Sequence, residues 1–455
     1  MLSLVTNISE YQMQLGNRLL SDSLILGGYS VRNKLLRSPQ KDIFEPSFSA
    51  KLSVLGSQQK FCSESMTPQN PKWSNAISRL SDMKMPVFWG DAFSVDKNLI
   101  MNSEGYDRLR YKAMVYPLPQ NDMITTRSTH VSQVANIAEV ISNKLGLNIE
   151  LTSAIAHGHD IGHSPFGHDG ERAINLITKE YDLPRFLHEK NGIRMADRIL
   201  IGLNEKGESV NLNLTYAVRD GIISHCGEMN QNFIKPRDEF IQLDDISKPA
   251  QYQPYTWEGA VVKIADKIAY LGRDIEDAVR LGVYNEKNLT DLNNIVKSVK
   301  PEFADAINSS SLVKLFIEDI VKNSTPQKGI GFSNQVSQIM DSIKKYNTEN
   351  IYVRDDVRFV SQSHTNCILA TIFKYYDSLY NGKGTINNID IQKNEYNKYF
   401  KEWLIKYTDN TFKSNDYKNK VLYDLDNQKD YRQAIVDYIS GMTDSFAIKS
   451  SNSLH

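Results

Sequence analysis

Cysteine is scarce in this sequence. Its 455 residues include only three cysteines, Cys62, Cys226 and Cys367, and they lie far apart. An odd number of isolated cysteines gives no disulfide framework, and none of them has the CxxC spacing of a metal-ligand pair. The sequence therefore excludes a disulfide-stapled fold and a cysteine-rich zinc module, and a reducing compartment fits it best.

Long apolar runs and an excess of one charge are also missing. No stretch approaches the ~20 apolar residues of a membrane span, and the first residues, MLSLVTNISEYQMQ, lack the charged start and apolar run of a signal peptide. The 53 lysines and arginines nearly balance the 54 aspartates and glutamates, so no global basic excess indicates nucleic-acid binding. We expect a cytoplasmic protein without membrane contact, in which a local basic patch can still surround an anionic substrate.

Helical periodicity is what the sequence does have, from about residue 96 to 282. Apolar residues recur on one face over 129–146 and again over 257–282, and Gly146 and Gly282 end these two stripes. Similar segments follow at 311–323 and 366–380, with loops predicted around 329–331 and 382–384. Convincing alternating strands are scarce. The predicted fold class is mainly α, with room for a short β-hairpin in the charged, proline-containing stretch 204–255.

Three regions are expected along the chain. They are an N-terminal extension over residues 1–95, a helical core over 96–282, and a C-terminal helical region over 283–455 that packs on the core. Residues 38–71 are rich in Ser, Gln, Pro and Lys, which predicts loops and short elements. The C-terminal region shows no chemistry in its sequence, and we expect it to support the core and contacts between subunits.

Histidines gather in the core. Seven of the nine lie between positions 130 and 225, namely His130, His157, His159, His163, His168, His188 and His225. Histidine is the usual nitrogen ligand of divalent metals and the usual acid–base group at neutral pH. The clustering therefore favours a metal or acid–base site.

His159 and Asp160 stand next to each other in AHGHDIGHSPFGHDGE, residues 156–171. Adjacent side chains on a helix splay by about 100°, but they can converge on one ion where a helix stops, as Gly162 and Pro165 indicate here. An isolated His-Asp pair is more often a polar helix end. The three further histidines in this segment favour a site instead.

His130 and Asp266 lie on the two expected helices, each beside an apolar face. Alone, His130 could be a hydrogen-bonded core histidine and Asp266 part of a solvated helix face, although a carboxylate beside a core is costly unless it is paired or metal-bound. With His159 and Asp160 they make two imidazoles and two carboxylates. Such a set suits Mn, Fe, Co, Ni, Zn or Mg, so we predict a divalent metal site.

His168 and Glu171 are three residues apart at an expected helix start, so they share a face. In that position the carboxylate could orient the imidazole. The alternative is an ordinary glutamate at a helix N-terminus.

A family resemblance rests on these residues and their neighbours. The order His130, His159-Asp160, Asp266 resembles the H…HD…D signature of HD-domain phosphohydrolases, and HDIGHSPFGHDGE is similar to the HDIGHPPFGHxGE segment of deoxyguanosinetriphosphate triphosphohydrolases and their dNTPase relatives. Segments on both sides of this motif also resemble family segments, in the expected order. They are NSEGYDRLRYKAMVYPLPQNDMITTRSTHVSQVA upstream, and FLHEKNG, GIISHCGE and ADKIAYLGRDIEDAV downstream. The similarity is clear over about residues 95–285 and implies an HD-domain core over 96–282.

The resemblance also implies roles for single residues. It implies that the metal is ligated by His130, His159, Asp160 and Asp266. It implies that triphosphate oxygens are held by Arg127, Lys267 and Tyr270, and that His163 contacts the α-phosphate region. The acid–base group near the scissile bond would be His168, supported by Glu171, together with His188.

The chain departs from the family pattern at three positions. The family's K-T-Q-V is Lys112-Ala113-Met114-Val115 here, and methionine cannot replace the hydrogen bonds of the Gln that lies by the sugar. Leu99 stands where relatives often have Arg, and Asp107 replaces the first of two Arg. These changes put the recognition of sugar, base and effector in question.

The first hypothesis is a metal-dependent dNTP triphosphohydrolase, with dGTP among its candidate substrates, that releases deoxynucleoside and inorganic triphosphate. One alternative is an HD-domain phosphohydrolase acting on another nucleotide or on a nucleic-acid phosphoester. The other is a non-catalytic nucleotide-binding regulator, which would not need His168 and Glu171. We expect a homo-oligomer, a tetramer or hexamer, and the resemblance leaves a nucleotide effector or single-stranded nucleic acid as a further partner.

Overall fold

Helices dominate the part of the chain that the structure describes. This computed structural model describes residues 59–116, 121–227, 232–303, 307–353 and 355–454, which all belong to one unit, Ser57–His455. Only two small antiparallel sheets occur among these residues. The prediction of a mainly α fold is confirmed.

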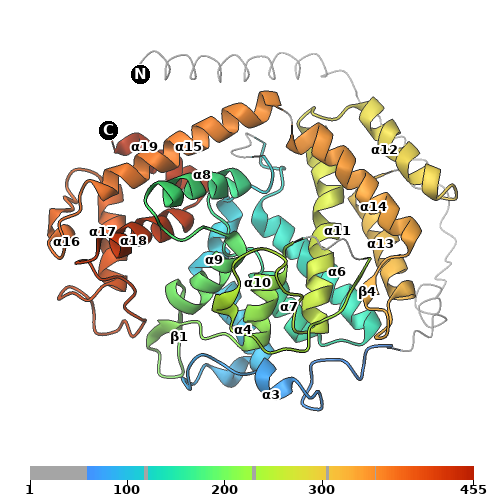
Figure 1. Ribbon diagram of the computed structural model, residues 1–455, viewed down its shortest axis with the longest axis horizontal. Helices are drawn as coiled ribbons and strands as arrows, with labels where there is room; N and C mark the ends of the chain where they lie inside the picture. The colour runs from blue at the N-terminus through green and yellow to red at the C-terminus, as the bar shows by residue number, and fades with distance from the viewer. Residues whose placement is uncertain (1–58, 117–120, 228–231, 304–306, 354, 455) are drawn as a thin grey trace, which may run out of the picture. The chain divides into compact units, whose positions relative to one another are not determined.

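Five helices form the centre of this unit and pack against one another (Figure 1). They are α4 (Ala92–Met101), α6 (Arg127–Leu145), α7 (Ile149–Gly158), α10 (Tyr216–Ser224) and α11 (Trp257–Arg280). The same part of the chain also forms four further helices: α3 (Trp73–Ala76), α5 (Glu104–Arg108), α8 (Gly167–Glu180) and α9 (His188–Arg194).

The two strongest helix predictions are confirmed to within about two residues. Helix α6 begins after Thr126, whose side chain accepts a hydrogen bond from the Thr129 amide, and ends at Gly146 with a φ of 85°. Helix α11 begins after Thr256, which caps the Gly259 amide in the same way. The apolar stripes of both helices are buried, so periodicity alone located the centre of the core.

The remaining helices lie on two sides of this centre (Figure 1). Helix α13 (Ser309–Asn323) packs on α6 and α11, and α14 (Asn334–Asn347) packs on α11 and on α12 (Glu286–Val299). Helix α15 (Asp355–Asp377) packs on α8, α18 (Gln428–Ser440) and α19 (Asp444–Ser453). The set is completed by α16 (Thr385–Asn388) and α17 (Glu395–Tyr407).

The strands differ in part from the sequence expectation. Strands β1 (Ile201–Leu203) and β2 (Ser209–Asn211) form a short hairpin that starts just before the expected stretch 204–255. Strand β3 (Phe233–Ile234) pairs with β4 (Ile330–Gly331), where the sequence predicted only a loop. A Cβ at Gly331 would lie 2.0 Å from the Asn232 carbonyl oxygen, so glycine permits this close pairing.

The three predicted regions are joined by packing. Helix α4 continues across position 95, and Phe61 and Met66 are buried in the same core as α6 and α11. The Met66 amide donates to the Glu258 carboxylate of α11 at 2.9 Å. The boundaries at 95 and 282 stay a prediction, and residues 1–58, including most of the predicted loop stretch 38–71, lie outside the described residues. No helix among the described residues combines the length and apolar character needed to span a membrane.

Candidate active site

A cavity of about 570 Å³ lies where α6, α8, α9 and α11 meet the turn after α7. Cavities of this size accommodate small-molecule ligands. Nine of the predicted site residues line it: Arg127, His130, Asp160, His163, His168, His188, Asp266, Lys267 and Tyr270. His159 and Glu171 lie directly behind this lining, in contact with Asp160 and His188. The structure thus brings all eleven predicted residues together at one cavity.

Four of these residues form a buried cluster, which we call the HD set: His130, His159, Asp160 and Asp266. Nε2 of His130 lies 2.9 Å from Oδ1 of Asp266. Nε2 of His159 lies 3.6 Å from Oδ1 of Asp160 and 3.9 Å from Oδ1 of Asp266. Ligand atoms of His130, His159 and Asp160 all lie within 4.8 Å of one another, which is close enough to share one ion.

The hydrogen bonding of His159 fits a divalent cation in this cluster. Helix α7 stops before His159, as the sequence predicted, and Nδ1 of His159 donates to the Ala156 carbonyl at 2.7 Å. That bond leaves the lone pair of Nε2 facing the two carboxylates, and Nε2 is buried with no hydrogen-bond partner among the described residues. A buried nitrogen without a partner is costly. A metal ion would satisfy it.

Charges within the HD set keep its carboxylates ionised. Burial alone would raise the pKa of Asp160, but His159, His163 and Arg127 outweigh burial and hold that pKa well below its usual range. Burial likewise opposes the ionisation of Asp266, and the hydrogen bond from His130 outweighs it, so the pKa of Asp266 is also lowered. Ionised carboxylates are the form that binds a cation.

The turn after α7 brings a second group of residues to the cavity. A Cβ at Gly162 would lie 2.2 Å from the His188 carbonyl oxygen, so glycine allows this turn to contact the start of α9. The rings of His163 and His188 consequently stack, with centroids 4.0 Å apart. Nε2 of His163 lies 3.1 Å from Oδ1 of Asp160, which places His163 between the HD set and His188.

Glu171 is shared by two histidines. Its Oε2 lies 2.9 Å from Nδ1 of His188 and 3.5 Å from Nδ1 of His168. We call these three residues the acid–base set. The sequence paired Glu171 with His168 first, whereas in the structure its shorter contact is with His188, because α9 approaches the side of α8 that carries Glu171.

The two histidines of the acid–base set differ in exposure. The side chain of His168 is 63% exposed, whereas that of His188 is 7% exposed. Burial alone would lower the pKa of His188, but the hydrogen bond to Glu171 and the charge of Glu189 outweigh it and raise that pKa. Burial would raise the pKa of Glu171, and its contacts with His168 and His188 lower it instead. His188 is therefore suited to hold a proton inside the cavity, and His168 can exchange one with water.

The cationic side of the cavity is formed by Arg127 and Lys267, with further basic residues along its wall: Arg172, Lys263 and Lys344. Arg127 is almost completely buried, and its guanidinium pairs with Oδ2 of Asp160 at 2.8 Å. Lys267 and Tyr270 follow Asp266 on α11, line the same cavity and are half-buried. These groups give the cavity the charge that a polyanion requires.

Sequence reasoning missed several residues of this cavity. Asp274 lines it, as does Tyr352, whose hydroxyl donates to the Asp274 carboxylate. His225 and Cys226 line the wall next to His188. Burial raises the pKa of Asp274 to about 7 and lowers that of His225 to about 3. Asp274 lies eight residues after Asp266 on α11, so helical spacing could have indicated it; Tyr352 is brought in only by tertiary packing.

The C-terminal helices hold two segments of the site. The Asp444 carboxylate accepts hydrogen bonds from the Phe166 amide at 2.8 Å and from the Ala113 amide at 3.0 Å. Lys112 donates to the Ser440 carbonyl at 3.1 Å and to the His163 carbonyl. These contacts position the turn after α7, residues 159–166, which we call the HD turn, and the segment of Met114. The sequence of the C-terminal region did not indicate this role.

The three departures from the family pattern have different surroundings. Met114 lines the cavity, Leu99 is buried in the core, and Asp107 is exposed and pairs with Arg110 at 3.2 Å. Only Met114 can therefore contact a bound ligand directly.

Comparison with known proteins agrees with this geometry. Residues 127–271 match the HD domain family, and residues 405–453 match the phosphohydrolase-associated domain. The first match contains the whole HD set and the acid–base set. The second contains Asp444 and its helix, which contact the HD turn.

Curated relatives match most of the chain. A deoxyguanosinetriphosphate triphosphohydrolase-like protein of Clostridium tetani is 30% identical, with 80% of this chain and 85% of the relative covered. Proteins of the same name from Desulfatibacillum aliphaticivorans and Rickettsia akari are 31% and 28% identical, covering 78% and 82% of this chain and 85% and 91% of the relatives. The chain belongs to the deoxyguanosinetriphosphate triphosphohydrolase-like family and, through its HD domain, to the metal-dependent phosphohydrolases.

Proposed function

We propose that this protein hydrolyses deoxynucleoside triphosphates to deoxynucleosides and inorganic triphosphate. The observation that carries the proposal is the single cavity in which the HD set faces the acid–base set, with basic residues along the wall between them. The names of the relatives support a deoxynucleoside triphosphate, dGTP among them, as the substrate.

The HD set would hold a divalent ion of the Mn, Mg, Fe, Co, Ni or Zn group. When bound, such an ion polarises the α-phosphoryl group and lowers the pKa of a water molecule. Arg127, Lys267 and the Tyr270 hydroxyl bind the triphosphate oxygens, which their positions on α6 and α11 allow. His163 lies between the HD set and His188, and it contacts the α-phosphate.

The residues of the acid–base set donate and accept the protons of the reaction. The oxygen of water bonds to the α-phosphorus while the bond from that phosphorus to the 5′-oxygen breaks. His188, whose pKa its carboxylate neighbours raise, donates its proton to the leaving 5′-oxygen. His168 takes the proton that the attacking water loses and passes it to solvent, and Glu171 stabilises the imidazolium of His188 until that ring donates its proton.

The hydrolysis experiment described below also distinguishes two other functions. A different phosphoester substrate is motivated by Met114, which removes a sugar contact from the cavity. A binding-only regulator is disfavoured because Glu171, His168 and His188 are arranged for proton transfer, which pure binding does not need.

The test is metal-supplemented hydrolysis of each dNTP and each NTP by the whole chain, with the products separated. We expect deoxynucleoside and triphosphate in equal amounts. Release of pyrophosphate or of inorganic phosphate from the same substrates would refute the proposed cleavage site. No turnover with any divalent metal, together with tight nucleotide binding, would support the regulator.

The expected assembly and location are separate proposals. We propose a cytoplasmic homo-oligomer, a tetramer or hexamer. Light scattering that gives a monomer in an active preparation, with and without nucleotide, would overturn the assembly.

A further inference from the structure

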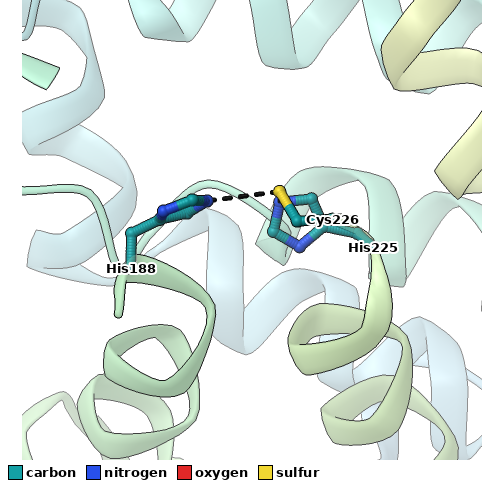
Figure 2. Close-up of side chains that lie close together, drawn as sticks. All are labelled: His188, His225 and Cys226. Atoms are coloured by element: carbon teal, nitrogen blue, oxygen red, sulfur yellow. Dashed lines mark hydrogen bonds between the residues drawn. The ribbon is translucent and has the colours of Figure 1, made fainter. Parts of the chain in front are cut away.

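A second group of metal-binding side chains lies beside the HD set. His188, at the start of α9, faces His225 and Cys226, which follow the end of α10 (Figure 2). Sγ of Cys226 lies 3.2 Å from Nε2 of His188 and 3.0 Å from Nε2 of His225. The three ligand atoms all lie within 4.8 Å of one another. The rings of His159 and His225 are 5.0 Å apart, so this group is a neighbour of the HD set.

Hydrogen-bond donors and acceptors do not balance in this group when both of its histidines are neutral. Nδ1 of His225 lies 2.6 Å from the Ile222 carbonyl, which can only accept, so Nδ1 carries the proton of the neutral ring. Nδ1 of His188 faces only carboxylate oxygens, those of Glu171 at 2.9 Å and of Glu189 at 3.6 Å. When both rings are neutral, each therefore directs the lone pair of Nε2 at Cys226, and the thiol has one proton for two acceptors. A proton on Nε2 of His188, which the neighbouring carboxylates favour by raising its pKa, occupies the place that a metal ion would otherwise take.

The surroundings add negative charge and rigidity. Oε2 of Glu189 is buried and has no hydrogen-bond partner within the described ranges, and the Glu189 side chain is 5% exposed. Lys263 donates to the carbonyl oxygens of Cys226 at 2.6 Å and of Ser224 at 3.1 Å, which fixes the backbone that carries the cysteine. A cation at Cys226 would satisfy both imidazole nitrogens and balance the carboxylate.

We propose that Nε2 of His188, Nε2 of His225 and Sγ of Cys226 form a second metal site, for a thiophilic divalent ion such as Zn²⁺. One thiolate and two imidazoles are ligands of the kind that bind zinc, and they leave a fourth position open. Tetrahedral zinc holds sulfur and nitrogen ligands roughly 3.5 Å apart. The observed separations of 3.0 and 3.2 Å therefore need to open by only a few tenths of an ångström.

Occupation of this site has a consequence for catalysis. Nδ1 of His188 faces Glu171, so the proton that His188 donates in the proposed function is the one on Nε2. The ion binds the same Nε2, so ion and proton exclude each other. Filling the second site should then lower turnover by about tenfold or more. This consequence rests on the proposed function, whereas the site itself rests only on the geometry of His188, His225 and Cys226.

Cobalt titration of the metal-free whole chain tests the site. Co²⁺ replaces zinc and shows a thiolate-to-metal charge-transfer band only when sulfur is a ligand. We expect two equivalents of Co²⁺ to bind and the band to grow with one of them. Cys226→Ser should lose the band and one equivalent and keep the other. Cys62→Ser and Cys367→Ser, which alter exposed cysteines, are the matched controls and should keep both.

The outcomes separate the site from the proposed function. No charge-transfer band in the wild type, or a band that survives Cys226→Ser, overturns the second site. The presence or absence of the band in the wild type tests the second site even if Cys226→Ser folds poorly. The one equivalent of Co²⁺ that Cys226→Ser still binds at the HD set shows whether this variant is folded. If the second equivalent binds and the enzyme loaded at the HD set keeps its turnover when Zn²⁺ is added, the site stands and the proton-donor role of His188 is wrong.

Discussion

The HD set and the acid–base set face each other across one cavity, yet they differ in how their charges are arranged. In the HD set two carboxylates face two imidazoles, and the buried Nε2 of His159 has no hydrogen-bond partner among the residues described. In the acid–base set one carboxylate contacts two imidazoles, and one of these, His168, is 63% exposed.

This difference indicates two kinds of chemistry from the same residue types. In the HD set Arg127 pairs with Asp160, but the buried Nε2 of His159 has no partner, and a cation from outside the chain would satisfy it and bind both carboxylates. One carboxylate with two imidazoles can balance its charge with a proton, and the exposed ring connects that proton to solvent. Substitutions in the HD set should therefore remove the metal, whereas substitutions in the acid–base set should slow turnover and leave the metal bound.

The largest effect is expected in the HD set. His159→Ala and Asp160→Ala each remove a donor from the proposed ion, so both should lose the bound metal and all measurable turnover. Elemental analysis of the purified variants, beside their rates, measures this. His157→Ala is the matched control, since His157 lies two residues before His159 at the end of α7, hydrogen-bonds to the Ser153 carbonyl and does not line the cavity. Equal metal content in the wild type and both variants would show that the HD set does not hold the metal, and the proposed difference between the two sets would be wrong.

The next largest effect is expected in the acid–base set. His188→Ala and His168→Ala should keep the metal of the HD set and bind dNTP with near wild-type affinity, but turn over ~10²–10⁴-fold more slowly. Glu171→Ala should change turnover in the same direction by a smaller factor, because it acts through the histidines. Metal content, nucleotide affinity and kcat are measured for all three. Loss of metal in His168→Ala, or an unchanged kcat with only a raised KM, would show that its assigned role is wrong.

A smaller effect is expected where the C-terminal helices hold the HD turn. Asp444→Ala leaves two buried amides, those of Phe166 and Ala113, without their acceptor, which should cost about 1–3 kcal/mol of unfolding free energy for each amide. Small displacements of positioning residues reduce rates by up to ~10²-fold. Denaturant unfolding and kcat are the two measurements. Asp409→Ala, an exposed aspartate of the same region, should change neither. An unchanged kcat in a destabilised Asp444→Ala would mean that this contact serves folding alone.

The smallest effect concerns the sugar. Because Met114 cannot hydrogen-bond a 3′-hydroxyl, dideoxynucleotides should be cleaved nearly as fast as deoxynucleotides. Met114→Gln should restore a preference for the hydroxyl, and sites that bond such a group discriminate by up to ~10⁴-fold. The ratio of kcat/KM for the two substrates measures this. Strong rejection of dideoxynucleotides by the wild type would show that another group, such as Asp274 or Tyr352, has replaced the glutamine.

Much of the fold could be predicted because its information is local. The apolar stripes of α6 and α11, the glycines Gly146 and Gly282 just beyond their ends, and the helix end at His159 all follow from residues a few positions apart. The eleven site residues at one cavity were expected from the family resemblance, which assigned their roles residue by residue.

The rest depends on contacts between distant residues. Asp444 reaches Phe166 across 278 positions of sequence, and Cys226 reaches His188 across 38. From their spacing along the sequence, the cysteines had no metal-binding neighbours and the C-terminal region had no contact with the site. The pairing of β3 with β4 at Gly331 was missed for the same reason, since two-residue strands carry no periodic signal.

Hydrolysis in water labelled with heavy oxygen tests the central claim most directly. The account predicts attack on the α-phosphorus and cleavage of its bond to the 5′-oxygen. One labelled oxygen should then appear in each triphosphate, and none in the deoxynucleoside, when the products are weighed by mass spectrometry. Label in the deoxynucleoside, or in a nucleotide product with pyrophosphate released beside it, would contradict the account.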